Sequence, residues 1–354
     1  MPTLRGLGTA TPASGWDQAD ALAFARARGA GSDGRRRALE ALYRRAGVEH
    51  RGIATPDSFY PTDDAPTTGA RMARYLELAR PLAREACGRA LEDAGAAADT
   101  VTHLVTVSCT GFEAPGPDLA LVADLGLRAD VTRAHVGFMG CHGLLNGLAV
   151  ARGFAATPGA RVLLCAVEVC SLHFLYGLPD EEAVSHALFA DGSAALVIDH
   201  EDAAGDAARG EHDWRLADTA SVLLPDSADA MGWRVGDHGF EMHLSARVPD
   251  LVGASVRPWL LRWLETHDLD LGAVGSWAVH PGGPRVLDAV HRALELPAGA
   301  TDVSRRVLAA HGNMSSATVG FLLARLRASG APAPCVALAF GPGLVAEAAL
   351  FIPG

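Results

Sequence analysis

Long apolar runs, paired cysteines and an excess of positive charge are all missing from this sequence. No stretch reaches the roughly 18–20 apolar residues that a membrane-spanning helix needs, and residues 1–16 contain no apolar signal core. The net charge is −11, which argues against nucleic acid as a partner. We therefore expect a cytoplasmic protein without a membrane span and without a nucleic-acid partner.

The cysteines do not suggest a disulfide framework or a metal site. None of the six stands in a CxxC pair or at another metal-like spacing, and a reducing compartment keeps such thiols free. Cys165 and Cys170 are five positions apart in an apolar run, so on a strand they point to opposite faces and cannot clamp one metal. We interpret both as packing residues and expect neither a metal nor a redox cofactor.

The order of apolar segments repeats along the chain. With 354 residues and 49% hydrophobic content the sequence can fill one large core or two fused halves. Each half places a strand first, then a helix, then two further strands. In the first half these are 103–109, the helix after Cys141, 161–169 and 194–199; in the second they are 275–281, the helix from Asn313, 335–341 and 345–352. The pattern predicts an α/β fold of two similar halves.

The boundary between the halves is expected in the polar, Asp- and Ala-rich stretch 200–214, which is typical of a surface connection. We assign residues 1–205 to an N-terminal half and residues 206–354 to a C-terminal half. A fused duplication of this kind usually has its active site where the halves meet, so chemically capable residues from both halves are of interest.

In the first half, the segment GFMGCHGLLNGL (137–148) singles out Cys141. Glycines on both sides permit a sharp turn and close approach of a ligand, and the residues that follow predict a buried helix. A thiol at a helix start is expected to have its thiolate favoured by the helix dipole. A small core cysteine is an equally good interpretation of this position alone. The adjacent His142 is no evidence of a catalytic pair, because neighbouring side chains diverge.

In the second half, His280 and Asn313 are expected to face the place where the two halves meet. His280 ends an apolar strand and precedes a Pro-Gly-Gly turn, and Asn313 stands where the second half's helix is expected to begin. Taken singly, His280 could be a strand-end histidine bonded to backbone, and Asn313 could be only a helix N-cap.

The sequence resembles the type III polyketide synthases, the chalcone synthase-like branch of the thiolase-fold condensing enzymes. The resemblance covers nearly the whole chain and rests on five motifs in order: GFMGCHG (137–143), ALFADG (187–192), HPGGP (280–284), GNMSSAT (312–318) and FGPGL (340–344). It implies a layered αβαβα core and a homodimer. It also implies acyl-CoA and malonyl-CoA as substrates, with no cofactor besides these thioesters.

The resemblance also assigns roles to residues. It implies that Cys141 is the acyl-carrying nucleophile, that His280 and Asn313 complete a triad, and that Phe189 is a gatekeeper ring. Cys109 falls where family members line the elongation cavity. By the same motifs Ser315, Gly341 and Pro342 are expected at the substrate site. Arg45 and Gly282 are expected to contact coenzyme A, although Arg44 or an ordinary solvated Arg-rich helix face fits the same stretch.

The chain departs from the plant members of the family at the cavity. Met242 stands in place of a second gatekeeper aromatic, and Trp233 stands where plant enzymes have a small residue. With His173 they suggest a reshaped cavity for an aliphatic starter, as in bacterial alkylresorcinol or alkylpyrone synthases. Both could equally be ordinary core side chains.

Three other functions fit parts of the pattern. A ketoacyl synthase of the fatty-acid initiation type shares the Cys, His and Asn set but performs a single condensation. A papain-like cysteine hydrolase uses the same residue types, although its cysteine lies near the mature N-terminus. A catalytically silent binding homologue is disfavoured by the intact triad.

Overall fold

The computed structural model describes residues 1–28, 33–62, 64–176, 183–201 and 214–354. Within them, nine strands are hydrogen-bonded in the order β11-β12-β13-β8-β1-β7-β6-β4-β5. One half of this order holds β1 (Thr3–Ala10), β4 (His103–Ser108), β5 (Thr132–Gly137), β6 (Arg161–Val169) and β7 (Asp191–Asp199). The other half holds β8 (Trp214–Leu223), β11 (Ser276–Val279), β12 (Cys335–Gly341) and β13 (Val345–Pro353).

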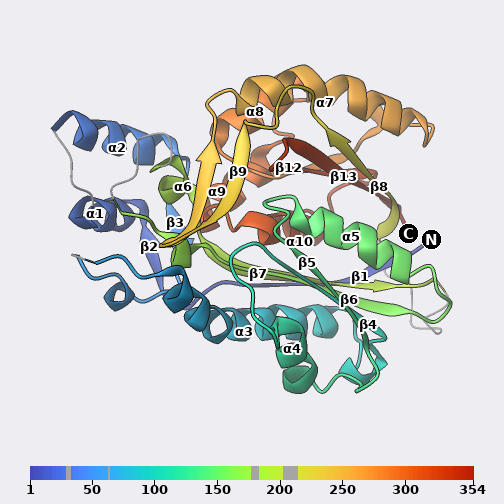
Figure 1. The fold of residues 1–354 in the computed structure, drawn as a ribbon. Coiled ribbons are helices and arrows are strands. Elements are labelled where there is room, and N and C mark those ends of the chain that lie inside the picture. Colours follow the sequence, from blue (N-terminus) through green and yellow to red (C-terminus); the bar gives the residue numbers. More distant parts are fainter. Residues whose placement is uncertain (29–32, 63, 177–182, 202–213) are drawn as a thin grey trace.

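Within the described ranges, the two halves of the sheet are joined at one corner. The start of β1 pairs with the start of β8 through Thr3 with Arg215 and Leu4 with Trp214, and from there the two sets of strands diverge and lie over one another (Figure 1). Helices α5 (Gly143–Phe154) and α10 (Thr318–Ala328) fill the space between them.

Further helices cover the outer faces. Figure 1 shows α3 (Thr68–Asp93) and α4 (Pro117–Leu125) below the first set of strands, and α7 (Val248–Glu265) and α8 (Pro284–Leu294) above the second. The result is the layered αβαβα arrangement, so the predicted fold class is confirmed.

Strand periodicity explains why these layers form. On β6, Val162, Leu164 and Ala166 belong to the central core around α5 and α10. The alternate residues Leu163, Cys165 and Val167 pack under α3. A strand that is apolar on both faces must be covered on both, because successive side chains point to opposite sides. The same alternation on β12 divides its residues between the central core and the α7–α8 core.

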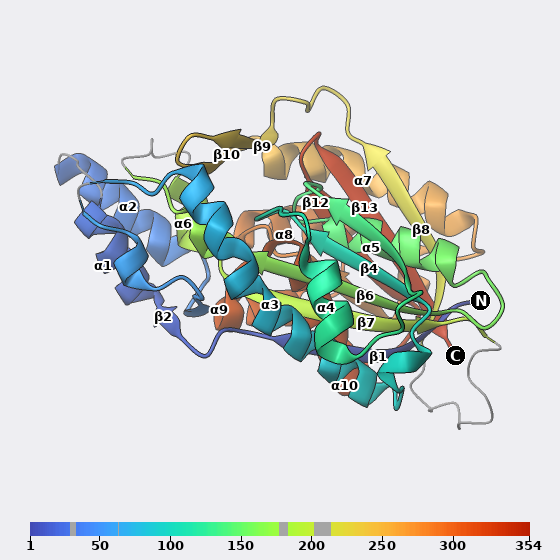
Figure 2. The same cartoon turned by 60° about the horizontal axis from the view of Figure 1, so that its bottom comes forward.

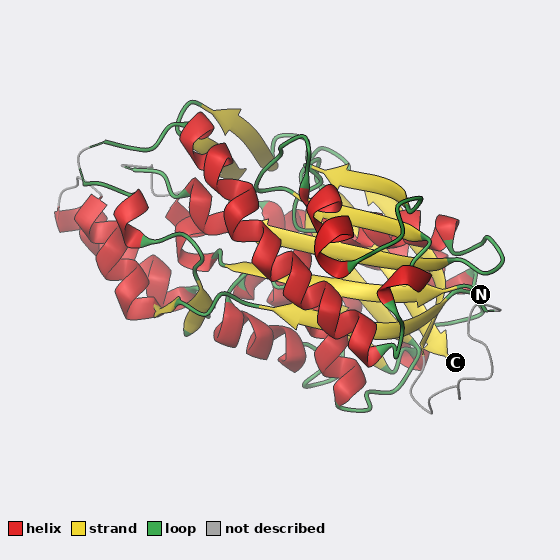
Figure 3. Ribbon diagram, turned by 90° about the horizontal axis from the view of Figure 1, so that it is seen from below, coloured by secondary structure: helices red, strands yellow, loops and turns green. Residues whose placement is uncertain are grey.

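Smaller elements gather at one end of the layers, opposite the two termini (Figure 2). Helices α1, α2, α6 and α9 and two short antiparallel ribbons form this end, as Figure 3 also shows by secondary structure. Their bounds are α1 (Gln18–Arg28), α2 (Asp33–Arg45), α6 (Ala183–Leu188), α9 (Asp302–His311), β2 (Gly15–Asp17), β3 (His50–Gly52), β9 (Met231–Gly236) and β10 (Gly239–Leu244).

One sequence prediction is corrected by the structure, and another concerns residues outside the described ranges. The second half's helix was expected to begin at Asn313, but α10 begins at Thr318, after a 3-10 turn over Ser315–Ala317. The predicted connection at 200–214 and the boundary at 205 lie mainly in 202–213, outside the described residues. Among the helices that are described, none is long and apolar enough to cross a bilayer.

Candidate active site

Cys141 lies in the turn between β5 and α5 and is only 7% exposed. Gly140 precedes it at a φ of +82°, where a Cβ would come within 2.4 Å of Pro342. Glycine is therefore required there both for the backbone conformation and for the close approach of the 340–344 turn. The turn thus brings the thiol of the first half against a loop of the second half.

Asn313 reaches the same place from the other half. Its backbone pairs with Phe189 in an isolated bridge, and Asn313 N–H and O bond to Leu188 O at 2.8 Å and Ala190 N–H at 2.9 Å. Its side-chain Oδ1 accepts the Ser315 N–H at 2.9 Å, so the amide NH₂ faces the Cys141 Sγ at 4.0 Å. Asn313 is therefore not the N-cap of α10, whose cap residue is Ala317.

His280 follows β11 and is 1% exposed. Its backbone N–H bonds to Leu338 O at 2.8 Å, which holds the residue at the end of the parallel pair β11–β12. Within the described part of the chain neither ring nitrogen has a hydrogen-bond partner. The imidazole is thus not a strand-end side chain satisfied by backbone, and both of its nitrogens are free to act on a ligand.

Electrostatics in the site favour uncharged groups. Burial raises the pKa of the Cys141 thiol to about 12, although hydrogen bonds from Ser315 and Asn313 oppose this. Burial, with the nearby His142, lowers the pKa of His280 to about 3. Burial therefore opposes the stabilisation of the thiolate that was expected from the helix dipole, because desolvation disfavours both ions.

Two cavities meet at Cys141. The inner cavity, of about 80 Å³, is lined by Cys109, His173, Trp233, Ser315 and Pro342, and it extends toward Trp16 and Phe24. The outer cavity, of about 600 Å³, is lined by His280, Asn313, Gly282 and Arg45. Cys141, Phe189 and Met242 line both. The three residues proposed for catalysis are therefore collected at one junction between the halves.

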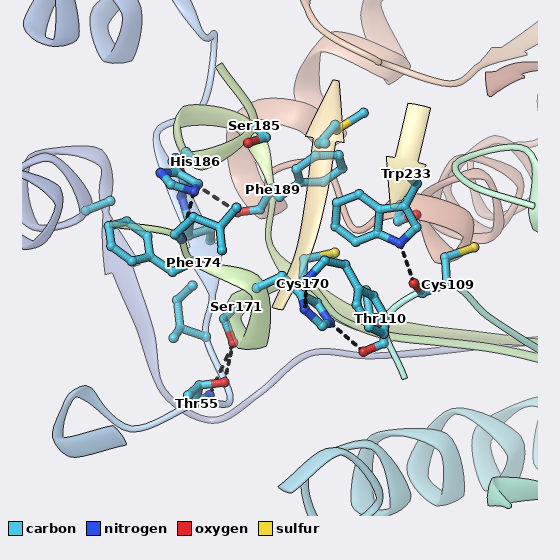
Figure 4. Close-up of a pocket in the computed structure, with 18 of the residues that line it drawn as sticks. Thr55, Cys109, Thr110, Cys170, Ser171, Phe174, Ser185, His186, Phe189 and Trp233 are labelled. Atoms are coloured by element: carbon cyan, nitrogen blue, oxygen red, sulfur yellow. Dashed lines mark hydrogen bonds between the residues drawn. The ribbon is translucent and has the colours of Figure 1, made fainter. Parts of the chain in front are cut away.

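The inner cavity has a wall of interlocked rings. Trp233 donates its indole N–H to Cys109 O at 2.7 Å, as Figure 4 shows, and lies edge-on to His173 at 5.6 Å. His173 stacks on Phe240 at 4.0 Å, donates to Thr110 O at 2.6 Å and accepts the Phe240 N–H at 3.0 Å. These contacts fix the β9–β10 ribbon as a wall of the cavity.

The opposite side of the inner cavity carries Thr55, Phe174 and His186 (Figure 4). Cys170 also lines the cavity, so it is not the pure packing residue that the sequence suggested. Gly341 is absent from the lining of both cavities and lies instead against the His142 ring. Of the two arginines considered, Arg45 lines the outer cavity, whereas Arg44 does not.

Sequence reasoning missed the buried carboxyl of Glu168 on β6. It accepts the Cys109 N–H at 3.0 Å and the Thr110 Oγ1–H at 2.7 Å, and it also accepts from Ser316 Oγ. Burial raises its pKa. The carboxyl thus ties the end of β4 to the turn that precedes α10. One acidic residue in the otherwise apolar run VLLCAVEV (162–169) was the available signal.

Comparison with known proteins gives a consistent result. The family model described as chalcone and stilbene synthases, N-terminal domain, matches residues 3–202, and the C-terminal domain model matches residues 215–352. A 1,3,6,8-tetrahydroxynaphthalene synthase of Streptomyces peucetius subsp. caesius is 39% identical over 314 residues, which cover 87% of this chain and 82% of that protein.

Two further proteins match over nearly their full length. The alpha-pyrone synthesis polyketide synthase-like Pks18 of Mycobacterium tuberculosis is 32% identical over 360 residues, which cover 99% of this chain and 91% of that protein. The crystal structure of PKS-I from the brown alga Ectocarpus siliculosus superposes with a TM-score of 0.94 at 30% identity, covering 100% of this chain and 98% of the other.

Proposed function

The chain belongs to the chalcone and stilbene synthase family, the type III polyketide synthases, which are decarboxylative condensing enzymes, and from this premise we propose how its own residues divide the reaction. Cys141 carries the starter and then the growing chain as a thioester. His280 takes the thiol proton, and His280 and Asn313 later hold the thioester oxygen of malonyl-CoA. The observation that carries this proposal is the meeting of Cys141, His280 and Asn313 at the junction of two cavities.

The chemistry of each step fits these side chains. During loading, the Cys141 sulfur attacks the carbonyl carbon of the acyl-CoA, the C–S bond to coenzyme A breaks, and His280 returns its proton to the departing thiolate. During extension, malonyl-CoA loses carbon dioxide and becomes an enolate. Hydrogen bonds from the Asn313 amide, and from the imidazole, stabilise the negative oxygen. The enolate carbon then attacks the carbonyl carbon of the Cys141 thioester, a C–C bond forms, and the C–S bond breaks to release the Cys141 thiolate, which leaves the extended chain on coenzyme A.

The outer cavity is suited to coenzyme A. Its volume of about 600 Å³ falls in the range of small-molecule sites. Its walls include apolar residues of α2 and α6, while Arg45 and Arg285 place cations on its lining. We assign the phosphates of the coenzyme to these arginines and its thioester end to Gly282 and the three catalytic residues.

The inner cavity receives the acyl chain. Its lining is mainly apolar, which suits an aliphatic starter and an alkylresorcinol or alkylpyrone product, in line with the relative named for alpha-pyrone synthesis. Its volume of about 80 Å³, with Trp233, His173 and Phe240 in the wall, restricts it to a short or slender chain. The relative named tetrahydroxynaphthalene synthase adds a fused aromatic product as a second candidate.

A second copy of the chain is the proposed partner. Phe112, Phe138 and Met139 are 53%, 36% and 42% exposed, and the first two rings pack on Phe240 in the cavity wall. Exposed apolar clusters mark interaction surfaces, and burying this one against a second copy would seal the cavity wall. Light scattering of the wild type against Met139→Asp tests this homodimer: dimeric wild type and a weakened variant are expected, and a monomeric wild type contradicts it.

The decisive test of the function is incubation with a panel of acyl-CoA starters and isotopically labelled malonyl-CoA, followed by mass spectrometry. Products that contain two or more labelled units are expected. One extension only indicates the ketoacyl synthase alternative, and free acid alone indicates a hydrolase.

A further inference from the structure

Three buried ring nitrogens close to the catalytic turn have no hydrogen-bond partner among the described residues: His142 Nε2 and both nitrogens of His280. His142 is 3% exposed and His280 is 1% exposed. Buried polar groups are nearly always paired, so each exception calls for an explanation. Two such histidines beside one nucleophile indicate that their ring nitrogens form hydrogen bonds during the reaction.

His142 is held by a hydrogen-bonded chain that ends in a buried carboxyl. Its Nδ1 contacts Asn146 Oδ1 at 2.6 Å, one helical turn later, and Asn146 Nδ2 donates to Glu347 Oε1 at 3.0 Å. Glu347 is 6% exposed and also accepts the Ser221 Oγ–H at 2.7 Å. None of these contacts belongs to the cavities described above.

The chain determines which nitrogen of His142 carries the proton. An ionised carboxylate can only accept, so the NH₂ of Asn146 must face Glu347 and its Oδ1 must face His142. The partner of that oxygen, Nδ1, is then the protonated nitrogen. The His142 Nε2 is left with a buried lone pair and needs a donor.

Strand register brings His280 to the same face of the sheet. On β11, Ala278 faces the central core while Val279 faces away, so the next residue, His280, returns to the central side. On β13, Ala346 and Ala348 face the α7–α8 core, so Glu347 between them faces the central side. Glu347 pairs across the strands with Ala339. The end of β12 therefore lies between His280 and Glu347.

His142, the N-cap residue of α5, lies over this strand end. A Cβ on Gly341, the last residue of β12, would come within 2.3 Å of the His142 ring, so the ring lies directly on that backbone. The charge of a protonated His142 lowers the pKa of His280. The two rings thus reach the same end of β12, His142 at Gly341 and His280 beside Leu338.

We propose that His142 is a positioning residue: when His280 removes the proton from Cys141, the other N–H of the resulting imidazolium donates to His142 Nε2. The inference rests on the proposed function of His280 as the base. The S–H bond of Cys141 breaks, an N–H bond forms on His280, and no other proton is gained or lost. The chain through Asn146 to Glu347 keeps His142 in the accepting tautomer and places a negative charge behind the cation.

This arrangement addresses the main energetic obstacle in the site. Burial raises the pKa of the Cys141 thiol and lowers the pKa of His280, so forming the thiolate and the imidazolium costs desolvation energy. The ionisable groups around the pair include Glu168 on β6, Cys109, Cys170, His142, and Glu347 on β13. Glu168 disfavours the thiolate. An acceptor for the imidazolium offsets that effect, as the carboxylate does in a Ser-His-Asp triad.

The test measures the rate at which iodoacetamide alkylates Cys141 as a function of pH, followed on the full chain by peptide mass spectrometry. His142→Phe keeps a ring of similar size but removes the acceptor. We expect its alkylation at pH 7 to slow by about tenfold, with the midpoint of the pH profile moved upward, because the imidazolium loses a hydrogen bond to a buried acceptor. The kcat should fall while the KM for malonyl-CoA stays unchanged, because the outer cavity is intact.

Two further variants complete the design. Glu347→Gln keeps an acceptor for Asn146 but removes the charge, and a smaller shift in the same direction is expected. Ser221→Ala removes the other donor to the same carboxylate oxygen and should behave as wild type. If His142→Phe does not fold, Glu347→Gln decides the question.

Wild-type alkylation profiles in both His142→Phe and Glu347→Gln overturn the inference, even if the variants lose thermal stability. This readout does not depend on acyl-CoA chemistry. Altered profiles in a protein that no CoA thioester acylates would leave the role of His142 standing and refute the proposed function instead.

Discussion

The Asn313 amide nitrogen lies 4.0 Å from the Cys141 sulfur, while its amide oxygen is held by the Ser315 N–H at 2.9 Å. The second contact determines the first, because an amide whose oxygen is occupied must turn its NH₂ the other way. The donor is thus oriented toward the thiol before any substrate binds. Preorganised donors of this kind stabilise developing negative charge without reorganisation at the moment of reaction.

This orientation predicts the effect of removing the amide. Asn313→Ala should slow malonyl-CoA decarboxylation by roughly 10²–10³, the usual cost of losing one oxyanion donor, whereas acylation of Cys141 should persist. Carbon dioxide release from labelled malonyl-CoA measures the first, and intact-protein mass spectrometry the second. Normal decarboxylation by the folded variant would reduce Asn313 to a structural element of the 313–315 turn.

The nucleophile assignment gives a second prediction. Cys141→Ala should abolish the acyl adduct formed with acyl-CoA, because the change removes the sulfur and little volume. Cys109→Ala is the matched control: Cys109 lies in the same cavity, accepts the Gly140 N–H at 2.9 Å and should remain dispensable for loading. An adduct on Cys141→Ala that disappears in the double variant would transfer the role to Cys109.

The two neighbouring arginines of α2 allow a paired test of coenzyme binding. Arg45 lines the outer cavity, whereas Arg44, one position earlier, does not. Arg45→Ala should raise the KM for malonyl-CoA several-fold with little change in kcat, since a phosphate contact remote from the reacting carbon stabilises substrate and transition state alike. Arg44→Ala should be neutral. Equal effects of both changes, or none, would place the coenzyme elsewhere.

Two substitutions at Trp233 distinguish the effect of its bulk on the cavity from the effect of its hydrogen bond. Trp233→Gly should change the starters accepted or the number of malonyl units added, because removing methylene-sized contacts alters discrimination by about 1–3 kcal/mol. Trp233→Phe retains most of the ring but loses the hydrogen bond to Cys109 O, so its product distribution should stay near wild type. Identical product profiles in all three proteins would show that this side chain does not shape the working cavity.

The buried histidines predict the response of stability to acid. Burial lowers the pKa of His173, His186 and His280 to about 3 each, below the value of about 6.5 in an unfolded chain. Since the unfolded state binds these protons first, stability is fully present above pH 6.5 and falls as pH drops toward 3. The slope contributed by each histidine is about 1.4 kcal/mol per pH unit.

Urea unfolding at pH 7, 6 and 5 measures this dependence. His280→Gln should flatten it by about one histidine's share, that is by about 1.4 kcal/mol per pH unit. His291→Gln replaces a partly exposed histidine of α8 and serves as the control. An unchanged slope in His280→Gln would show that burial does not lower the pKa of this imidazole in the folded state.

The sequence predicted the architecture because strand and helix periods are local properties. Buried runs such as 161–169 are apolar on both faces and required covering layers on both sides, which the structure shows. The start of α10 was misplaced by five residues because a 3-10 turn and a backbone bridge occupy 313–317. Neither has a hydrophobic period that the sequence could reveal.

The sequence indicated which residues would lie together at the candidate site, but not their electrostatics. Five ordered motifs indicated Cys141, His280 and Asn313, which lie together at the cavity junction. The charge state of the thiol depends on how deeply the turn is buried, and the network of Glu168 depends on contacts between β4, β6 and the turn before α10. Sequence separations of 59 to 148 residues hide such contacts.

The backbone bridge between Phe189 and Asn313 joins the two halves at the site, so activity depends on how the halves dock. The Phe189 ring, which lines both cavities, comes from the N-terminal half, and the Asn313 amide facing the thiol comes from the C-terminal half, yet their backbones pair in one bridge. Neither fragment holds all three groups proposed for catalysis. Two inactive fragments supplied together would regain turnover only on correct docking, which would make the reaction a sensor of complementation between the halves.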